Sequence, residues 1–197
     1  MSLTRPLILA SASPRRREIL GNLGLAFSTE PADLDETQHA GEAPDRYVMR
    51  LALEKAASVA RTLSEPFAVL GADTTVVLAG EVMGKPTGAA ESEAMLRKLR
   101  GRRHVVHTGV ALVLWPEQSE RVTLVSTEVG FRAFDDDTLR RYVASGEGLD
   151  KAGSYGIQEL GAALVSTVHG SYSNVVGLPA AETIELLQGS GVLDGWP

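Results

Sequence analysis

Residues 7–20 read LILASASPRRREIL and combine small hydroxyl side chains with a run of arginines. Ser13 and Pro14 form a typical helix start, because a serine oxygen caps free backbone amides and proline lacks the N–H that would be unpaired there. The arginines at positions 15–17 then fall in the first helical turn, where the helix dipole already places partial positive charge. With Ser11 they supply hydroxyl, backbone and guanidinium donors, the chemistry that binds a chain of phosphates. A helix start that simply faces water is the alternative interpretation.

Asp73 is the candidate for acid–base chemistry. It follows an apolar run in the motif GADTT, and a carboxylate at a strand end can ligate a hard cation or accept a proton from water. An aspartate that bonds its own backbone in a turn is the alternative. Asp35 and Glu36 are further candidates, because a divalent ion that bridges a triphosphate often needs more than one carboxylate.

Lys55 and Lys85 add positive charge that a triphosphate would need. The spacing of apolar residues predicts a helix over residues 45–63, and Lys55 falls on its otherwise apolar stripe. A lysine that snorkels to the surface, and an ordinary loop lysine at position 85, are the alternative interpretations. The apolar stripe weakens the first alternative, so Lys55 is the stronger candidate of the two.

Helices and strands are expected to alternate along the chain. The patterns predict strands at residues 7–9, 104–114, 121–134 and 163–169, and two more on either side of a polar interruption at residues 73–75. They predict helices that begin at Pro14 and that span residues 45–63, 89–100, 135–146 and 179–187. Loops rich in glycine are expected at residues 150–161 and 170–179. This order predicts an α/β or α+β protein with a mixed sheet, in a single domain over residues 1–197.

Composition excludes several classes of protein. The 197 residues carry 19 basic and 25 acidic side chains, a net charge of −6, which argues against a general RNA or DNA binder. There is no apolar run of roughly 20 residues and no secretory leader, so we expect a cytoplasmic protein with no membrane partner. The absence of cysteine excludes disulfides and thiolate metal sites. The local basic cluster is therefore expected to bind something small.

Five sequence blocks together resemble the Maf family of nucleoside triphosphate pyrophosphatases. They are SASPRRREIL (11–20), YVMRLALEKA (47–56), GADTTVVLAGEVMGKP (71–86), DKAGSYGIQ (150–158) and GSYSNVVGLP (170–179). The resemblance implies hydrolysis of a nucleoside triphosphate, the small-molecule substrate, to the monophosphate and pyrophosphate with a divalent cation. Oxygen ligands and the absence of cysteine favour Mg²⁺ or Mn²⁺ as that cation. It also implies an elongated two-lobed α/β fold related to inosine triphosphatase, with a central cleft, and a possible homodimer.

The resemblance also assigns roles to individual residues. It implies that Asp73 is the catalytic carboxylate, which accepts the proton of the attacking water, holds the metal, or does both. The residues that it implies in phosphate binding are Ser11, Ser13, Arg16, Lys55 and Lys85. The residues that it implies in substrate choice are Arg15, Thr74 and Gln158. Glu36 falls at an acidic position of the family and is a second candidate metal ligand, whereas Arg17 falls at a variable position and has no assigned role.

The loop DKAGSYGIQ is similar to that of the dTTP/UTP branch of the family, with Tyr155 before the glycine and Gln158 two residues after it. The branch that acts on 7-methyl-GTP typically carries phenylalanine there. A glutamine amide can pair with a carbonyl and the N3–H of thymine or uracil, because it offers both a donor and an acceptor. We expect Gly153 and Gly156 to let this loop close over the base. The 7-methyl-GTP branch and a non-catalytic, nucleotide-binding regulator of cell division or septum formation are the alternatives.

Overall fold

The structure is a computed structural model, and it describes residues 2–196. Its strands are β1 (Ser2–Leu3), β2 (Leu7–Leu9), β3 (Ser28–Thr29), β4 (Phe67–Leu78), β5 (Glu81–Met83), β6 (Arg103–Trp115), β7 (Ser119–Phe131), β8 (Val165–His169) and β9 (Leu193–Asp194). Its α-helices are α1 (Pro14–Asn22), α2 (Pro44–Ala60), α3 (Ala89–Leu99), α4 (Asp136–Ser145), α5 (Tyr172–Val176) and α6 (Ala180–Gly189). Two short 3₁₀ helices, η1 (Ala152–Ser154) and η2 (Leu160–Leu164), lie between α4 and β8.

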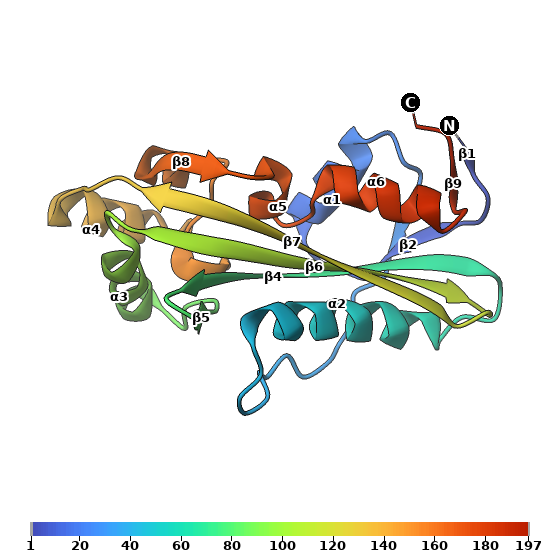
Figure 1. Cartoon of the computed structure of the whole chain (residues 1–197). Helices are drawn as coiled ribbons and strands as arrows, with labels where there is room; N and C mark the ends of the chain where they lie inside the picture. Colours follow the sequence, from blue (N-terminus) through green and yellow to red (C-terminus); the bar gives the residue numbers. More distant parts are fainter. Residues whose placement is uncertain (1, 197) are drawn as a thin grey trace. The chain divides into compact units, whose positions relative to one another are not determined.

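The main sheet has the strand order β3-β2-β4-β6-β7-β8, with β5 paired to β4 (Figure 1). Strand β2 runs parallel to β3 and β4, whereas β5 is antiparallel to β4 and β8 is antiparallel to β7. A separate two-stranded sheet joins β1 and β9. The sheet is therefore mixed and alternates with helices along the chain, which confirms the predicted fold class.

The chain divides into two compact units. Unit 1 holds the residues up to 73, residues 108–125 and the residues from 177 onward; unit 2 holds residues 74–107 and 126–176. The chain passes from one unit to the other inside β4, β6 and β7, and again after α5. The single domain with a cleft between two lobes, as expected from the sequence, stays a prediction.

Unit 1 buries both faces of its part of the sheet, because side chains alternate between the two faces along each strand. Leu7 and Leu9 of β2 pack in the cluster that contains residues of α1 and α6, while Ile8 packs in the cluster that contains residues of α2. In β4, Leu70 packs in the first of these clusters and Val69 packs in the second. Figure 1 accordingly shows α2 along one face of these strands and α1 and α6 along the other.

Helix α2 approaches the strands of unit 1 at two glycines. A Cβ atom added to Gly71 would overlap the carbonyl oxygen of Ala52, and one added to Gly109 would overlap that of Val48. The helix backbone, with no side chain between, therefore lies directly against β4 and β6 at these points. This close approach fixes the height of α2 above the sheet.

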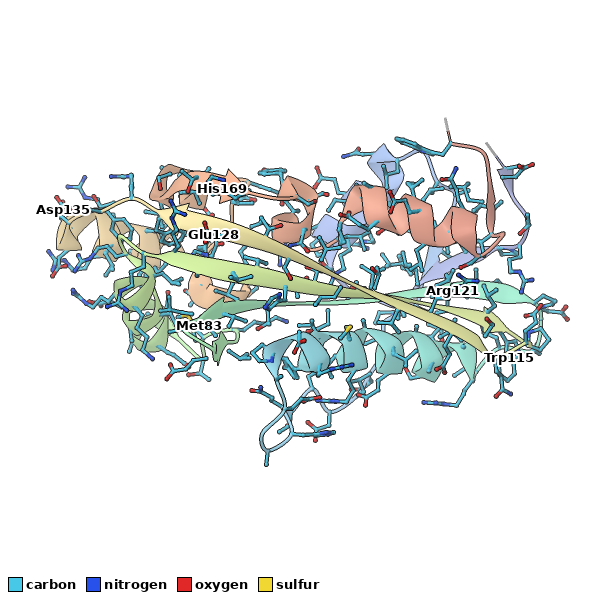
Figure 2. All side chains as sticks on the ribbon, viewed as in Figure 1. Met83, Trp115, Arg121, Glu128, Asp135 and His169 are labelled. Atoms are coloured by element: carbon cyan, nitrogen blue, oxygen red, sulfur yellow. The ribbon has the colours of Figure 1, made fainter. Side chains whose placement is uncertain are left out.

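The turn of the β6–β7 hairpin lies in unit 1. Figure 2 labels Trp115 and Arg121 near the turn that joins the two strands. Arg5 reaches this turn, where its guanidinium donates to the Trp115 carbonyl at 3.4 Å and pairs with Glu117 at 2.9 Å. The turn is thereby tied to the segment that precedes β2.

Unit 2 contains a tight hairpin between β4 and β5. Ala79 and Gly80 both have positive φ, 51° and 86°, as a two-residue turn of this kind requires. Helix α3 contacts α4 and η1 in this unit. Strand β8 pairs with β7 with Glu128 opposite His169, and both are labelled in Figure 2.

Several sequence expectations about elements were wrong or incomplete. For example, β7 spans Ser119–Phe131 and not residues 121–134, and the predicted loop at 150–161 contains η1 and the start of η2. Strand β4 continues through residues 73–75 without the predicted interruption, because the charge on Asp73 is met by a lysine from α2. The predicted loop at 170–179 contains the short helix α5, whose Asn174 N–H bonds the Ser171 hydroxyl at 3.2 Å. Helix α2 begins one residue earlier and ends three residues earlier than expected.

The glycines of the loop at 150–161 serve close packing. A Cβ on Gly153 would lie 2.9 Å from a methyl group of Val76, and the Gly153 N–H donates to the Gly84 carbonyl at 3.1 Å. Gly156 has the side chain of Lys151 at 2.9 Å from its Cβ position. The expectation that Gly153 and Gly156 let the loop close over the base stays a prediction, and the structure shows Gly153 buried and hydrogen-bonded.

Within residues 2–196, every helix is too short or too polar to cross a membrane.

Candidate active site

The start of α1 in unit 1 brings Ser11, Ser13 and Arg16 together. The Ser13 hydroxyl accepts the backbone N–H of Arg16 at 3.4 Å, which confirms the predicted N-cap. The Ser11 hydroxyl accepts the N–H of Ser13 at 3.2 Å and a guanidinium N–H of Arg16 at 3.3 Å. Nε of Arg16 also donates to the Gly177 carbonyl at 2.8 Å. The guanidinium is thus fixed in place and does not simply extend into water.

Charges around Arg16 act on it in opposite directions. Burial lowers the pKa of Arg16 below its ordinary value, Asp73 opposes this shift, the neighbouring Arg15 adds to it and Glu36 opposes it. An arginine remains a cation at neutral pH in such surroundings. Arg15 is half-buried on the same turn of α1. The start of α1 therefore concentrates fixed positive charge next to two hydroxyls.

Lys55 of α2 joins two carboxylates in unit 1. Its Nζ lies 2.7 Å from Oδ1 of Asp73 and 2.7 Å from Oε1 of Glu36. Lys55 and Asp73 are each 7% exposed, whereas the side chain of Glu36 is 47% exposed. The predicted stripe of α2 is also confirmed, because Leu51 and Val59 on either side of Lys55 are buried. One buried cation is therefore shared by an enclosed carboxylate and an accessible one.

Burial is the main influence on the acidity of Asp73. It raises the pKa of Asp73 above its ordinary value of 3.8, and attraction to Lys55 and then to Arg16 offsets part of that increase. Glu36 repels the Asp73 carboxylate and raises the pKa further. A buried carboxylate with a raised pKa is a better proton acceptor than one in water, once it is ionised.

The segment that carries Glu36 is held against α2 by residues that the sequence analysis did not single out. The Tyr47 hydroxyl donates to the Glu36 carbonyl at 2.9 Å, and Arg50 donates to the Thr37 carbonyl at 3.2 Å. Arg50 also binds both carboxylate oxygens of Glu42, at 2.7 and 2.8 Å. The signal in the sequence was that positions 47 and 50 share one helix face.

Asp35 has a local role in the same segment. Its Oδ1 accepts the backbone N–H of Thr37 at 2.9 Å and the Thr37 hydroxyl at 2.6 Å. These two hydrogen bonds lower the pKa of Asp35 below its ordinary value. Asp35 therefore shapes the turn in which Glu36 lies, as an aspartate in a turn often does.

The donor set of Asp73 and Glu36 fits a hard divalent cation. Mg²⁺ and Mn²⁺ take oxygen ligands, and Mg²⁺ in phosphate-transfer sites is typically bound by one or two carboxylates, several waters and the substrate phosphates. Two carboxylates that share one ammonium meet this requirement. Within residues 2–196 there is no group of three or more His, Asp or Glu side chains able to hold a metal by itself.

The other candidate residues belong to unit 2. Thr74 follows Asp73 in β4 and is half-buried, Lys85 is exposed just after β5, and Gln158 is exposed in the segment between η1 and η2. The structure thus brings Ser11, Ser13, Arg16, Glu36, Lys55 and Asp73 together within unit 1. The roles of all these residues stay predictions.

The fold of this chain is an α/β fold similar to that of a solved HAM1 protein. A solved HAM1 protein from Coxiella burnetii aligns with 95% of this chain and 100% of its own, with a TM-score of 0.52 and 17% sequence identity, a similarity of fold alone. The family follows from the sequence: the model of the Maf-like protein family matches residues 6–190. The chain belongs to the Maf-like protein family, as its sequence blocks predicted.

Curated relatives align over almost the full chain. A protein of Myxococcus xanthus is 53% identical over 96% of this chain and 95% of the relative, and one of Moorella thermoacetica is 51% identical over 96% and 97%. A third, from Hahella chejuensis, is 48% identical over 95% and 94%. All three relatives are named dTTP/UTP pyrophosphatase.

Proposed function

We propose that this chain is a dTTP/UTP pyrophosphatase, which hydrolyses dTTP and UTP to the nucleoside monophosphate and pyrophosphate. The observation that carries this function is the name shared by the curated relatives, which are about half identical to the chain from end to end. The site in unit 1 supports the same chemistry, because it pairs a phosphate-binding helix start with a buried carboxylate.

The start of α1 binds the triphosphate in this proposal. Arg16 is already aligned by Ser11 and Gly177, so little side-chain freedom is lost when phosphate oxygens bind its guanidinium. The hydroxyls of Ser11 and Ser13 act as acceptors within the site, and their own hydrogens can turn toward a phosphate. Lys55 and Lys85 contribute further charge.

Asp73 accepts the proton in the hydrolytic step. The oxygen of a water molecule attacks the α-phosphorus. The bond between the α-phosphorus and the oxygen that bridges the α- and β-phosphates breaks, and pyrophosphate leaves with the electron pair of that bond. The water proton passes to the Asp73 carboxylate, which Lys55 and Arg16 help to keep ionised. Asp73 and Glu36 would hold a divalent cation, Mg²⁺ or Mn²⁺, which when bound offsets negative charge on the phosphates.

Gln158, Thr74 and Arg15 select the nucleotide in this proposal. The exposed amide of Gln158 is free to offer a donor and an acceptor to the edge of thymine or uracil. A site that hydrogen-bonds one base disfavours bases that leave its polar groups unpaired. The resemblance of the loop to the dTTP/UTP branch supports this assignment.

A panel of nucleoside triphosphates, assayed separately for pyrophosphate and orthophosphate, tests the function. We expect dTTP and UTP to be cleaved fastest, with pyrophosphate as the first product. Orthophosphate as the first product would contradict the pyrophosphatase assignment. Faster cleavage of 7-methyl-GTP would favour the other branch, and binding of dTTP without hydrolysis would favour a regulator.

A cytoplasmic location and a homodimer are further proposals that rest on the sequence and on the family resemblance. Size-exclusion chromatography with light scattering measures the oligomeric state directly, and a monomer at micromolar concentration would contradict the homodimer.

A further inference from the structure

The segment of unit 2 that carries Gln158 forms a closed loop whose two ends meet. A Cβ on Gly161 would overlap the carbonyl oxygen of Gly156, so the backbones of these two residues are in direct contact. Between them, Ile157 is buried at 8% exposure, and Gln158 is exposed. The loop at residues 156–161 is thus anchored on one side by Ile157 and presents Gln158 on the surface of the unit.

One carboxylate and one phenol hold both ends of this loop. Glu147 accepts the N–H of Leu160 at 2.8 Å through Oε2, and the N–H of Gly161 at 3.0 Å through Oε1. The Tyr142 hydroxyl donates to Oε1 of Glu147 at 3.1 Å, and its oxygen accepts the N–H of Gly156 at 3.1 Å. We call Glu147 and Tyr142 the loop clamp.

The end of α4 directs the clamp toward the loop. Gly146 has φ of 75°, a left-handed conformation that turns the chain so that Glu147 leaves the helix axis. The Ser145 hydroxyl accepts the Glu147 N–H at 3.3 Å and supports this turn. Tyr142 lies in α4 and is 6% exposed. Burial raises the pKa of Tyr142, so its hydroxyl stays protonated and remains a donor to Glu147.

Two of the clamp bonds, those from the backbone amides of Leu160 and Gly161, end on the Glu147 carboxylate. Hydrogen bonds from amides to an ionised carboxylate are shorter and stronger than those between neutral groups. Without them, the N–H groups of residues 156, 160 and 161 would lose their partners, and the loop would sample other conformations. A side chain on a mobile loop must be ordered when it binds, and this entropy cost weakens recognition.

We propose that Glu147 and Tyr142 are positioning residues, which fix the loop at residues 156–161 so that Gln158 can recognise the pyrimidine base. The inference rests on the proposed dTTP/UTP activity and extends it, since it adds two residues to the determinants of substrate choice. Neither residue contacts the triphosphate in this scheme. Their loss therefore affects selectivity for the base more than the capacity for hydrolysis.

Steady-state kinetics of Glu147→Ala and Tyr142→Phe test the proposal, with dTTP and dATP as substrates. We expect kcat/KM for dTTP to fall on the order of tenfold, mostly through KM, and kcat/KM for dATP to change little. Glu159→Ala is the matched control, because it removes an exposed carboxylate from the same loop. The selectivity of Glu159→Ala for dTTP over dATP should equal that of the unaltered protein. Glu147→Gln keeps one acceptor oxygen and should retain part of this selectivity.

A double mutant separates positioning from general structural support. If Glu147 acts through Gln158, Glu147→Ala should change selectivity by less than about twofold in a Gln158→Ala background. The reason is that the effects of two substitutions on selectivity do not add when one residue acts through the other. Hydrogen exchange should show faster exchange at the amides of residues 156, 160 and 161 in Glu147→Ala, with the rest of unit 2 unchanged. Equal losses for dTTP and dATP in both backgrounds would overturn the proposal.

The unaltered protein distinguishes failure of the clamp from failure of the function. If it does not cleave dTTP, the proposed function and the clamp's role in base recognition are both wrong. If it cleaves dTTP selectively and both clamp variants retain that selectivity, the function stands and the clamp proposal is wrong. Tyr142→Phe removes a single oxygen, so it keeps the test decisive should Glu147→Ala fail to fold.

Discussion

At Asp73, a single carboxylate meets two requirements that conflict. Burial favours its protonated form, while catalysis needs the ionised form, and the Lys55 ammonium at 2.7 Å reconciles them. The pair is shielded from water, because the side chains of Lys55 and Asp73 are 9% and 10% exposed. Removal of one partner would leave the other as a buried charge, the costly case for an ion pair. The neighbouring Glu36 moderates this cost, since it also bonds Lys55.

Asp73→Asn tests the catalytic role. The amide has the same size and can still accept a hydrogen bond from Lys55, but it cannot accept a proton. Turnover should therefore fall by about 10² to 10⁴, the usual contribution of a general base. Pyrophosphate release measures the rate, and the melting temperature of the variant should fall only modestly, because Glu36 still pairs with Lys55. Full turnover in Asp73→Asn would contradict the assignment.

Arg16→Ala tests the phosphate contact at the same scale. The variant removes a cation from the first turn of α1, which by itself stabilises the helix by about 0.3 to 1 kcal/mol. It also leaves the Gly177 carbonyl without its Arg16 donor at 2.8 Å, a cost of about 1 to 3 kcal/mol. We expect a net loss of about 1 kcal/mol in the free energy of unfolding, with a large rise in KM. Chemical denaturation and kinetics measure the two effects, and unchanged kinetics would contradict the phosphate contact.

At the scale of elements, α2 carries more of the site than its single lysine. The helix supplies Lys55 from one face, and from another it holds the segment of Glu36 through Tyr47 and Arg50. The bidentate bond from Arg50 lowers the pKa of Glu42 to about 2. The tie between Glu42 and Arg50 is thus present at neutral pH and is lost only as pH falls from about 4.5 toward 2.

Arg50→Ala should loosen the segment at residues 36–42. Glu36 would then be held less firmly near Lys55, and we expect kcat/KM to fall on the order of tenfold, with more Mg²⁺ needed for half-maximal activity. Arg50→Lys should not restore the activity fully, because lysine lacks the planar fork that binds both oxygens of Glu42. Arg46→Ala, at an exposed position of the same helix, is the control. A magnesium dependence equal to that of the control would contradict this role.

Local sequence patterns predicted most of the helices and strands, but they did not predict the contacts between side chains that lie far apart in the sequence. The N-cap at Ser13 and the apolar stripe around Lys55 depend on neighbours within a few residues, so the sequence alone revealed them. The polar residues at 73–75 suggested a break in the strand, because the partner of Asp73 lies 18 positions earlier in the chain. Arg50 and Glu147 were missed for the same reason: their contacts with Thr37 and Gly161 span 13 and 14 positions.

At the scale of the molecule, one buried histidine links stability to pH. His104 is 2% exposed, its Nε2 lies 2.8 Å from the Tyr155 hydroxyl, and both rings pack against Phe131 in unit 2. Nδ1 is buried with no hydrogen-bond partner among residues 2–196. Burial therefore lowers the pKa of His104 from 6.5 to about 4, because the charged ring would be poorly solvated.

The sign of the resulting pH dependence follows from linkage. The unfolded chain binds a proton at His104 near pH 6.5 and the folded chain only near pH 4, so stability is fully present above 6.5 and falls as pH decreases to about 4. The loss should amount to about 3 kcal/mol at the lower limit. Unfolding curves at several pH values measure it. His104→Gln should show a smaller slope between pH 6.5 and 4, and an unchanged slope would contradict this origin.

The contact of α2 with Gly71 and Gly109 limits which sequences this fold accepts. Because the helix backbone occupies the space of a Cβ at both positions, even alanine would have to displace the helix, and Lys55 would move with it. In a saturation-mutagenesis screen for activity, these two glycines would therefore score as strongly as Asp73, although neither bears a functional group. Only the yield of folded protein would separate the two kinds of inactive variant.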